Sequence, residues 1–385
     1  MGNDLLQTCY QKSLDLLRAN ATPAGILASS RTKKAVGRHY ASIFGRDASI
    51  CALGMVASGE PDLIESARLG LLTLAHCQAA NGQIPKYVKP DSGEVDFWYT
   101  GCIDATLWWL IALSFMDQSG ADERLSRKLA PQAALAIKWL ECQEHQKWYL
   151  LQQNEASDWA DIMPRSGFVL YSNVLWHWVK RLYDLPNTSE TRDYARLLFW
   201  PYGNVVPEER RARLLMHYIR QRSRQTPFYL SFVNFAAWGE EIDIFGNLLA
   251  ALTGLAAIST AGKLVLAMQA LQAHRPYPLR VTGSPIRQDA RLWRLYMQRH
   301  RQNLPWQYHN GGSWPFVGGF WVMLLARLGR EKEALTELEY LARANQVNNW
   351  EFNEWFHGQS GKAMGMPGQS WNAALFILAY RTVFN

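Results

Sequence analysis

The chain has 385 residues, of which 48% are apolar, and a formal net charge of +7 from 40 Lys plus Arg against 33 Asp plus Glu. This size and apolar fraction allow a large core, and no stretch reaches the roughly 18 uninterrupted apolar residues of a membrane-spanning helix. The basic residues are spread along the chain instead of forming one stripe, so we expect no nucleic acid and no membrane among its partners.

Apolar residues recur at helical spacing along most of the chain, and this periodicity predicts roughly fourteen helices. They are expected at about 4–19, 47–58, 63–74, 102–117, 123–143, 168–184, 189–199, 207–220, 241–257, 261–273, 286–300, 313–329, 331–346 and 367–383. The segment from Leu107 to Leu113 is apolar on more than one side, which predicts a helix buried between layers. Only 94–97 and 280–282 read as short strands.

Short and long connections alternate between these helices. The joins at 59–61 and 328–330 are short. The long ones, rich in Gly, Pro, Trp and acidic residues, are 20–46, 80–101, 144–167, 221–240, 274–284, 303–312 and 347–366. This alternation predicts an all-α toroid of nested helical hairpins, with pocket-forming loops on one rim. No Pro/Ser-rich linker divides the chain, so we expect a single domain over residues 1–385.

Tryptophan is unusually abundant, with 17 residues. A bulky core is one interpretation. Many of these rings stand beside polar residues in loops, however, as in Asp96-Phe97-Trp98-Tyr99 and Ser157-Asp158-Trp159. That placement favours a lined cleft.

The five cysteines are odd in number and lack metal-ligand spacing, and the first residues show no basic segment followed by an apolar one. We therefore expect reduced thiols, no export signal and a cytoplasmic location.

Arg46 and Asp47 stand near an expected helix start. Asp47 alone could cap the backbone N–H groups there, whereas an Arg–Asp pair could also hold sugar hydroxyl groups. Asp104 directly precedes the apolar, Trp-rich helix, and on local grounds it would be the N-cap. A carboxyl buried at that position would be desolvated, which favours the protonated form that a general acid needs.

One loop before a helix holds three carboxylates, including Asp158 and Asp161, together with Trp159 and Arg165. Solvation at the surface explains a single acid more readily than all three. A metal site is conceivable, but the aromatic residues suit a sugar better.

A second aromatic segment contains Trp306, His309, Asn310, Ser313 and Trp314. Sugars have apolar ring faces and hydroxyl edges, so rings beside hydrogen-bonding groups are what a sugar pocket requires.

Glu351 and Glu354 follow in a further aromatic cluster, three residues apart. On a helix they would share a face, and in a loop only one need point inward. One of them could activate water as a general base, while an ordinary exposed glutamate is the simpler interpretation, more so for Glu351.

The sequence has no phosphate-binding loop, dinucleotide fingerprint, nucleophile elbow or zinc-protease helix. The remaining reactive groups are carboxylates among aromatics, the usual apparatus for cleaving a glycosidic bond. We expect no cofactor and no metal.

In several blocks, spread over most of the chain, the sequence resembles the six-hairpin (α/α)6-barrel glycoside hydrolases, namely the alkaline/neutral invertases and the amylo-α-1,6-glucosidase part of glycogen-debranching enzymes. The blocks are Gly45-Arg46-Asp47, Ile103-Asp104-Ala105-Thr106-Leu107-Trp108-Trp109, Phe245-Gly246-Asn247-Leu248, Tyr308-His309-Asn310-Gly311-Gly312-Ser313-Trp314-Pro315, and more weakly Glu354-Trp355-Phe356-His357-Gly358 leading to Gly368-Gln369-Ser370-Trp371. The resemblance implies an inverting hydrolase with Asp104 as the acid and Glu354 as the base, and it adds Gln369 to the substrate site. The loop with Asp158 and Asp161 looks more like the acid-bearing loops of trehalase- and glucosidase-like barrels, so these two compete for the acid role.

We therefore expect an exo-acting hydrolase of a small α-glucoside, with sucrose or an α-1,6-linked glucose as the substrate. A homo-oligomer is compatible with the sequence. The alternatives are a carbohydrate-binding protein on a barrel without catalysis and a sugar epimerase that would use His309 and His357.

Overall fold

A computed structural model describes residues 2–97 and 102–384. Its contacts group into two compact units, the first formed by residues 1–139, 274–279 and 313–385 and the second by 140–273 and 280–312. We describe each unit by itself, and the single domain stays a prediction. Within the described ranges, no helix is both long enough and apolar enough to cross a membrane.

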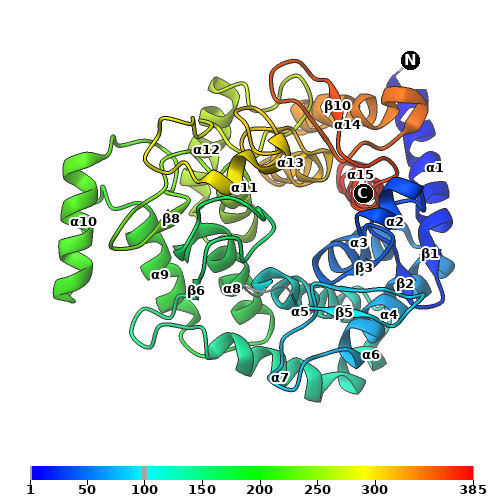
Figure 1. Cartoon of the computed structure of the whole chain (residues 1–385), viewed down its shortest axis with the longest axis horizontal. Helices are drawn as coiled ribbons and strands as arrows, with labels where there is room; N and C mark the ends of the chain where they lie inside the picture. Colours follow the sequence, from blue (N-terminus) through cyan, green and yellow to red (C-terminus); the bar gives the residue numbers. More distant parts are fainter. Residues whose placement is uncertain (1, 98–101, 385) are drawn as a thin grey trace. The chain divides into compact units, whose positions relative to one another are not determined.

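Helices dominate both units (Figure 1). Those of the first unit are α1 (Gly2–Asn20), α2 (Lys33–Gly37), α3 (Gly45–Ser58), α4 (Pro61–His76), α5 (Ile103–Gln118), α6 (Glu123–Lys128), most of α7 (Ala130–Glu141), α13 (Pro315–Arg327), α14 (Glu331–Trp350) and α15 (Ser370–Phe384). Those of the second are α8 (Leu170–Leu182), α9 (Thr188–Phe199), α10 (Arg210–Arg222), α11 (Ile244–Thr253), α12 (Ile258–Ala270) and the 3-10 helix η1 (Leu295–Arg301).

Most predicted helices are confirmed, and three differences have local causes. The stretch 123–143 forms two helices, and Asp122 caps the first by accepting from the backbone N–H groups of Arg124 and Leu125. Only the end of 286–300 is helical, as η1. The short helix α2, capped by Thr32, has too few residues for a periodic pattern to reveal it.

The strands are two or three residues long and form small antiparallel sheets of two or three strands. In the first unit they are β1 (Ala21–Thr22), β2 (Gly25–Ile26), β3 (Ile43–Phe44), β4 (Tyr87–Val88), β5 (Val95–Asp96), β9 (Trp355–Phe356) and β10 (Ala363–Met364), and in the second β6 (Gln152–Gln153), β7 (Gly167–Val169) and β8 (Phe232–Val233). The strand predicted at 94–97 is confirmed as β5. The one predicted at 280–282 is wrong, because this segment makes only isolated bridges, as between Thr282 and Asp243.

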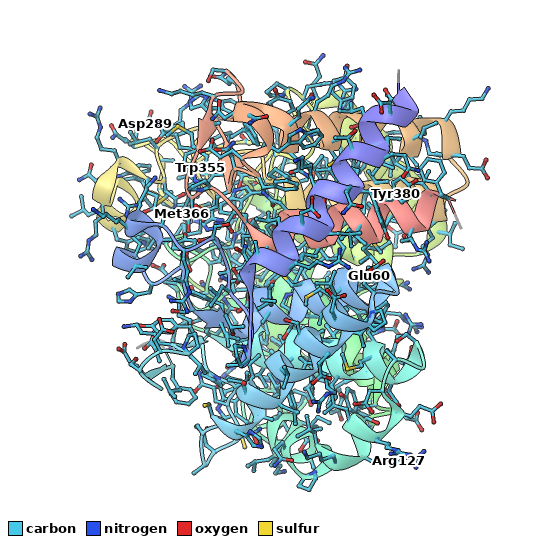
Figure 2. All side chains as sticks on the ribbon, turned by 90° about the vertical axis from the view of Figure 1, so that its right-hand side faces the viewer. Glu60, Arg127, Asp289, Trp355, Met366 and Tyr380 are labelled. Carbon is cyan, nitrogen blue, oxygen red and sulfur yellow. The ribbon has the colours of Figure 1, made fainter. Side chains whose placement is uncertain are left out.

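The core of the first unit lies around α5 and α15. Every residue from Ile103 to Ser114 is buried, which confirms the expected helix between layers. Helix α15 packs against α1, α3, α13 and α14, and Figure 1 shows α3 and α15 side by side. At its far end Tyr380, labelled in Figure 2, packs on Tyr10 of α1 with ring centroids 4.8 Å apart.

A glycine allows the close approach of α3 and α15. A Cβ atom added at Gly54 would lie 2.0 Å from the carbonyl oxygen of Ala374, far inside van der Waals contact. The two helices can pack at this distance only because the position carries no side chain.

We predict opposite effects for two Gly→Ala substitutions inside helices. Gly54→Ala should lower the free energy of unfolding by about 1–3 kcal/mol, because α3 and α15 must separate. Gly262→Ala in α12, where an added Cβ meets nothing within 4 Å, should raise it by roughly 0.5–1 kcal/mol through the better helix propensity of alanine. Urea unfolding of both variants measures this, and equal effects would contradict the packing described here.

Candidate active site

A buried arginine joins the starts of three helices in the first unit. Arg46, in the first turn of α3, places its Nη1 3.3 Å from Oδ2 of Asp104 in α5 and its Nε 3.4 Å from Oδ2 of Asp47. Its guanidinium carbon also lies 6.0 Å from the ring centroid of Trp371 in α15. Preceding it, Gly45 has a backbone so close to Pro85 that an added Cβ would lie 2.4 Å from the Pro85 carbonyl oxygen.

Asp104 is completely buried, at 0% exposure. It lies inside the first turn of α5, and Cys102 takes the N-cap position without making a side-chain capping bond. The Cys102 thiol donates to Oδ1 of Asp104 over 3.1 Å, opposite the arginine on Oδ2. Burial and the nearby Asp104 raise the pKa of Cys102 well above its ordinary value, so this thiol stays protonated and can donate.

Glu354 is held by two donors in the loop after α14. The Tyr40 hydroxyl donates to Oε1 over 2.7 Å and the backbone N–H of Met366 donates to Oε2 over 2.9 Å. The Glu354 N–H in turn donates to the Met366 carbonyl, and Figure 2 labels Met366 and the neighbouring Trp355. Gly365 is required beside them, since its φ is +82° and an added Cβ would lie 2.4 Å from Oε2 of Glu354.

Glu351 has a different environment from Glu354. It ends α14 as the C-cap, is partly exposed and accepts from Nδ2 of Asn348 over 2.6 Å. Asn348 and Asn349 have positive φ, so regular helix geometry stops before either glutamate. Of the two, only Glu354 is buried, with 3% exposure.

Several buried polar groups near Glu354 have no hydrogen-bond partner among the residues that the structure describes. They are both side-chain polar atoms of Gln369, Nδ2 of Asn353, Oγ of Ser313 and Nε1 of Trp371. Backbone pairing ties Ser313 to Phe356 and Gln369 to Phe352, so these residues border the Glu354 loop. Buried polar groups normally find partners, so these atoms are available to hydrogen-bond a ligand.

A second carboxylate stands among aromatic rings in the other unit. Oδ2 of Asp161 accepts from the Tyr308 hydroxyl over 2.9 Å and lies 3.8 Å from Nε2 of His309. Trp159 packs edge-on against His309, with ring centroids 4.6 Å apart. The Asp161 side chain is 32% exposed, so solvent or a ligand can reach it.

Asp158 supports the same loop from inside. It is buried, its Oδ1 accepts from the Ala160 backbone N–H and its Oδ2 accepts from Gln153. Both bonds join Asp158 to residues close to it in the sequence, so its carboxylate stabilises the conformation of this loop.

Arg165 is also buried, with Nε 3.3 Å from Glu241 and Nη1 3.2 Å from Asp243, at the start of α11. Its observed contacts are therefore two ion pairs that anchor the loop.

The aromatic block at 306–315 is divided between the units after Gly312. The Asn310 side chain bonds to both backbone groups of Ile286 and to the Asn303 carbonyl, so it shapes its loop. The Trp306 ring lies 5.1 Å from the Arg280 guanidinium carbon. In the first unit, Trp314 is buried edge-on against Trp371, with ring centroids 5.8 Å apart.

The structure thus brings Arg46, Asp47 and Asp104 together in one cluster and Trp159, Asp161 and His309 in another. Trp98 and Tyr99 lie outside the described residues. Tyr40, Cys102 and Asn353 were not predicted from the sequence. Tyr40 lies 314 positions from its partner Glu354. Cys102 and Asn353 stand beside the predicted Asp104 and Glu354, and this proximity was the signal that could have found them. The catalytic and substrate-binding roles assigned above stay predictions.

A family model described as alkaline and neutral invertase matches residues 212–385. Among curated proteins, cytosolic invertase 1 of Oryza sativa subsp. japonica is 21% identical, with 93% of this chain and 74% of that protein covered. Alkaline/neutral invertase C, mitochondrial, of Arabidopsis thaliana is 28% identical over 109 residues, and this match spans 28% of the chain but only 16% of that relative.

Solved structures show the fold. The GH63 mannosylglycerate hydrolase of Thermus thermophilus, in complex with Tris and D-glycerate, superposes with a TM-score of 0.68 at 15% identity, covering 96% of this chain and 99% of that one. A wild-type glycosidase gives 0.60 at 13% identity, covering 100% and 98%. The predicted (α/α)6 fold class and the resemblance to invertases are confirmed, and together they support a glycoside hydrolase.

We predict that the buried ion pairs make Arg46 essential for stability. Arg46→Met should lower the free energy of unfolding by about 3–5 kcal/mol, because two buried carboxylates lose their cation. The double variant Arg46→Met/Asp104→Asn should recover part of this loss, since a neutral amide replaces one of the stranded charges. Arg18→Met, which breaks exposed pairs with Glu60 and Asp62, should cost less than about 1 kcal/mol. Urea unfolding that gave Arg46→Met and Arg18→Met equal losses would contradict this picture.

Proposed function

We propose that the chain is an exo-acting, inverting glycoside hydrolase of a small α-glucoside, with Glu354 as general base. The observation that carries this proposal is the position of Glu354, buried and held by two donors, one on each oxygen. Both bonds stabilise the charged carboxylate, the form that accepts a proton from water. The segment that matches the invertase family, 212–385, includes this residue.

Asp104 is the proposed general acid. Arg46 contacts one of its carboxyl oxygens and the Cys102 thiol the other, so the side chain is positioned at the start of α5. Inverting enzymes need an acid that protonates the leaving oxygen and a base on the opposite face of the sugar. Asp104 and Glu354 are proposed for these two roles, and both belong to the first unit. Asp161 is the alternative acid, supported by its partial exposure and its position beside Tyr308 and His309.

Gln369, Asn353 and Ser313 are proposed to bind the sugar. Their side-chain atoms without partners offer both donors and acceptors, as a ring of hydroxyl groups requires. Arg46 and Asp47 would fix the same sugar from α3, and Trp314 and Trp371 would limit the pocket with their rings.

Sucrose is the first substrate to test, because the similar curated proteins are named invertases. An α-1,6-linked glucose is the second. The screen comprises sucrose, isomaltose, panose, trehalose and glucosylglycerate, with released glucose as the readout. Since the similar proteins include cytosolic, mitochondrial and chloroplastic ones, the cytoplasmic location stays a prediction.

Two substrates with different leaving groups should separate the base from the acid. Glu354→Gln should lower kcat about 10²–10⁴-fold on both the natural glycoside and α-glucosyl fluoride, because each reaction needs an activated water. Asp104→Asn should be as damaging on the glycoside but far milder on the fluoride, since fluoride leaves without a proton. Steady-state kinetics measure both.

If Asp161→Asn strongly reduced activity on the glycoside but only mildly on the fluoride, the acid would be Asp161. Full activity of Glu354→Gln would overturn the mechanism. Sugar binding without turnover of any tested glycoside would instead indicate a non-catalytic binding protein.

We further predict that Tyr40 positions the base. Tyr40→Phe should reduce kcat about tenfold and move the acidic limb of the kcat/KM profile to higher pH, because the charged Glu354 loses the hydrogen bond from the Tyr40 hydroxyl. Tyr10→Phe, which alters a tyrosine packed between α1 and α15, is the matched control and should leave the profile unchanged. An unshifted profile for Tyr40→Phe would contradict the positioning role.

A further inference from the structure

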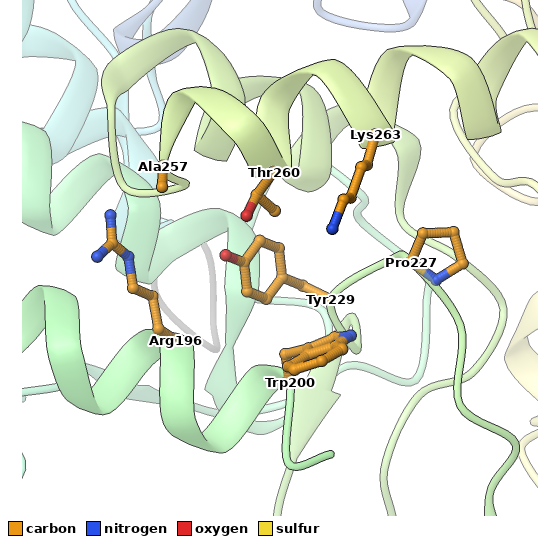
Figure 3. Close-up of a pocket in the computed structure, with 7 residues that line it drawn as sticks. All are labelled: Arg196, Trp200, Pro227, Tyr229, Ala257, Thr260 and Lys263. Atoms are coloured by element: carbon orange, nitrogen blue, oxygen red, sulfur yellow. The ribbon is translucent and has the colours of Figure 1, made fainter. Parts of the chain in front are cut away.

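A separate pocket of about 300 Å³ lies in the second unit, between α9, α12 and the segment before β8 (Figure 3). Arg196 of α9 and Lys263 of α12 line it together with the hydroxyl-bearing residues Tyr229 and Thr260. All of its lining residues belong to the second unit, whereas Asp104 and Glu354 belong to the first. The glycosidase mechanism makes no use of it.

The pocket is positively charged. Arg196 donates through Nε to the Leu255 carbonyl, which orients its guanidinium, and its terminal nitrogens have no partner in the described part of the chain. Lys263 likewise makes no ion pair with the residues described, and no carboxylate lines the pocket. Two cations without a counterion attract an anion.

The start of α12 adds to this charge. The helix begins at Ile258, and its N-cap is Ala257, whose methyl group cannot accept a hydrogen bond from the first turn. This turn also contains no acidic residue. Ala257 and Thr260 both line the pocket, so the free N–H groups of this turn border it.

A tyrosine with an unpaired hydroxyl provides independent evidence for a ligand. Tyr229 is only 6% exposed, and its hydroxyl has no hydrogen-bond partner among the described residues. Its backbone is fixed at both polar atoms by the Asn247 side chain. Figure 3 shows this hydroxyl directed toward the side of the pocket where Arg196 and Thr260 lie. A hydroxyl that lines a pocket on an otherwise buried and fixed side chain offers a ligand both a donor and an acceptor.

The remaining wall is flat and apolar. The Trp200 indole is fixed because its Nε1 donates to the Thr226 carbonyl over 2.9 Å, and Pro227 lies beside the same space. Figure 3 shows the indole below the Lys263 ammonium. An aromatic plane of this kind packs against the apolar face of a sugar ring.

We propose that this pocket binds a sugar monophosphate. The phosphate carries about 1.5 to 2 negative charges at neutral pH and only accepting oxygens when fully ionised, which matches Arg196, Lys263 and the start of α12. The sugar ring lies over Trp200, and one of its hydroxyl groups pairs with the Tyr229 hydroxyl. The volume is at the lower end for small-molecule pockets, which fits a hexose phosphate.

Isothermal titration of the full chain tests this proposal with glucose 6-phosphate, inorganic phosphate, glucose and glucuronate as probes. Glucose 6-phosphate should bind at least tenfold tighter than each of the other three, because only it offers both a phosphate and a ring. Lys263→Glu should weaken this binding at least tenfold, and Tyr229→Phe should weaken it severalfold. Lys12→Glu, the same charge change at an exposed position of α1, should leave it unchanged.

Equal affinity for inorganic phosphate or for glucuronate would overturn the assignment to a sugar phosphate, and so would equal weakening by Lys12→Glu. Competition between glucose 6-phosphate and the glycoside substrate, combined with full binding by Lys263→Glu, would place the ligand in the active site instead. Because Lys263 is exposed, its substitution tests the site without a risk to folding.

Discussion

The buried guanidinium of Arg46 is the interaction on which the first unit depends. Its Nε lies 3.4 Å from Asp47 and its Nη1 lies 3.3 Å from Asp104, and both of these acidic side chains are buried. Because these residues open α3 and α5, and Trp371 opens α15, one side chain fixes three helix starts. The glycines at 45 and 54 let the same helices approach closely. The contacts of Arg46 therefore hold the three helices together and also position residues of the candidate active site. The proposed acid, Asp104, is positioned by its contact with Arg46.

The proposed base is built differently, from loop geometry. Glu354 follows a break in regular helix at Asn348 and Asn349 and is fixed by the β9–β10 hairpin and by Tyr40. Gly365 leaves room for its carboxylate. Buried polar atoms of neighbouring residues remain unsatisfied, which distinguishes a binding site from a completed core.

Helical periodicity was sufficient to predict most helices and the burial of α5, because long apolar patterns report directly on packing. Apart from β5, the short strands could not be predicted, nor could the 3-10 geometry at 295–301 or the break between α6 and α7, because these depend on single capping and pairing bonds. Motif resemblance indicated Asp104 and Glu354. The partner Tyr40 and the pocket around Tyr229 arise from tertiary contacts that leave no mark in local sequence. Cys102 is close to Asp104 in the sequence, but its hydrogen bond depends on the local geometry at the start of α5.

The central claim is that two carboxylates act from opposite faces of the sugar, so that water replaces the leaving group with inversion. The stereochemistry of the first product tests this most directly. Proton NMR of the hydrolysed α-glucoside, recorded before the anomers equilibrate, should show β-glucose appearing first. Initial release of α-glucose would indicate retention and a covalent intermediate, and would contradict the assignment of Glu354 as a base that activates water.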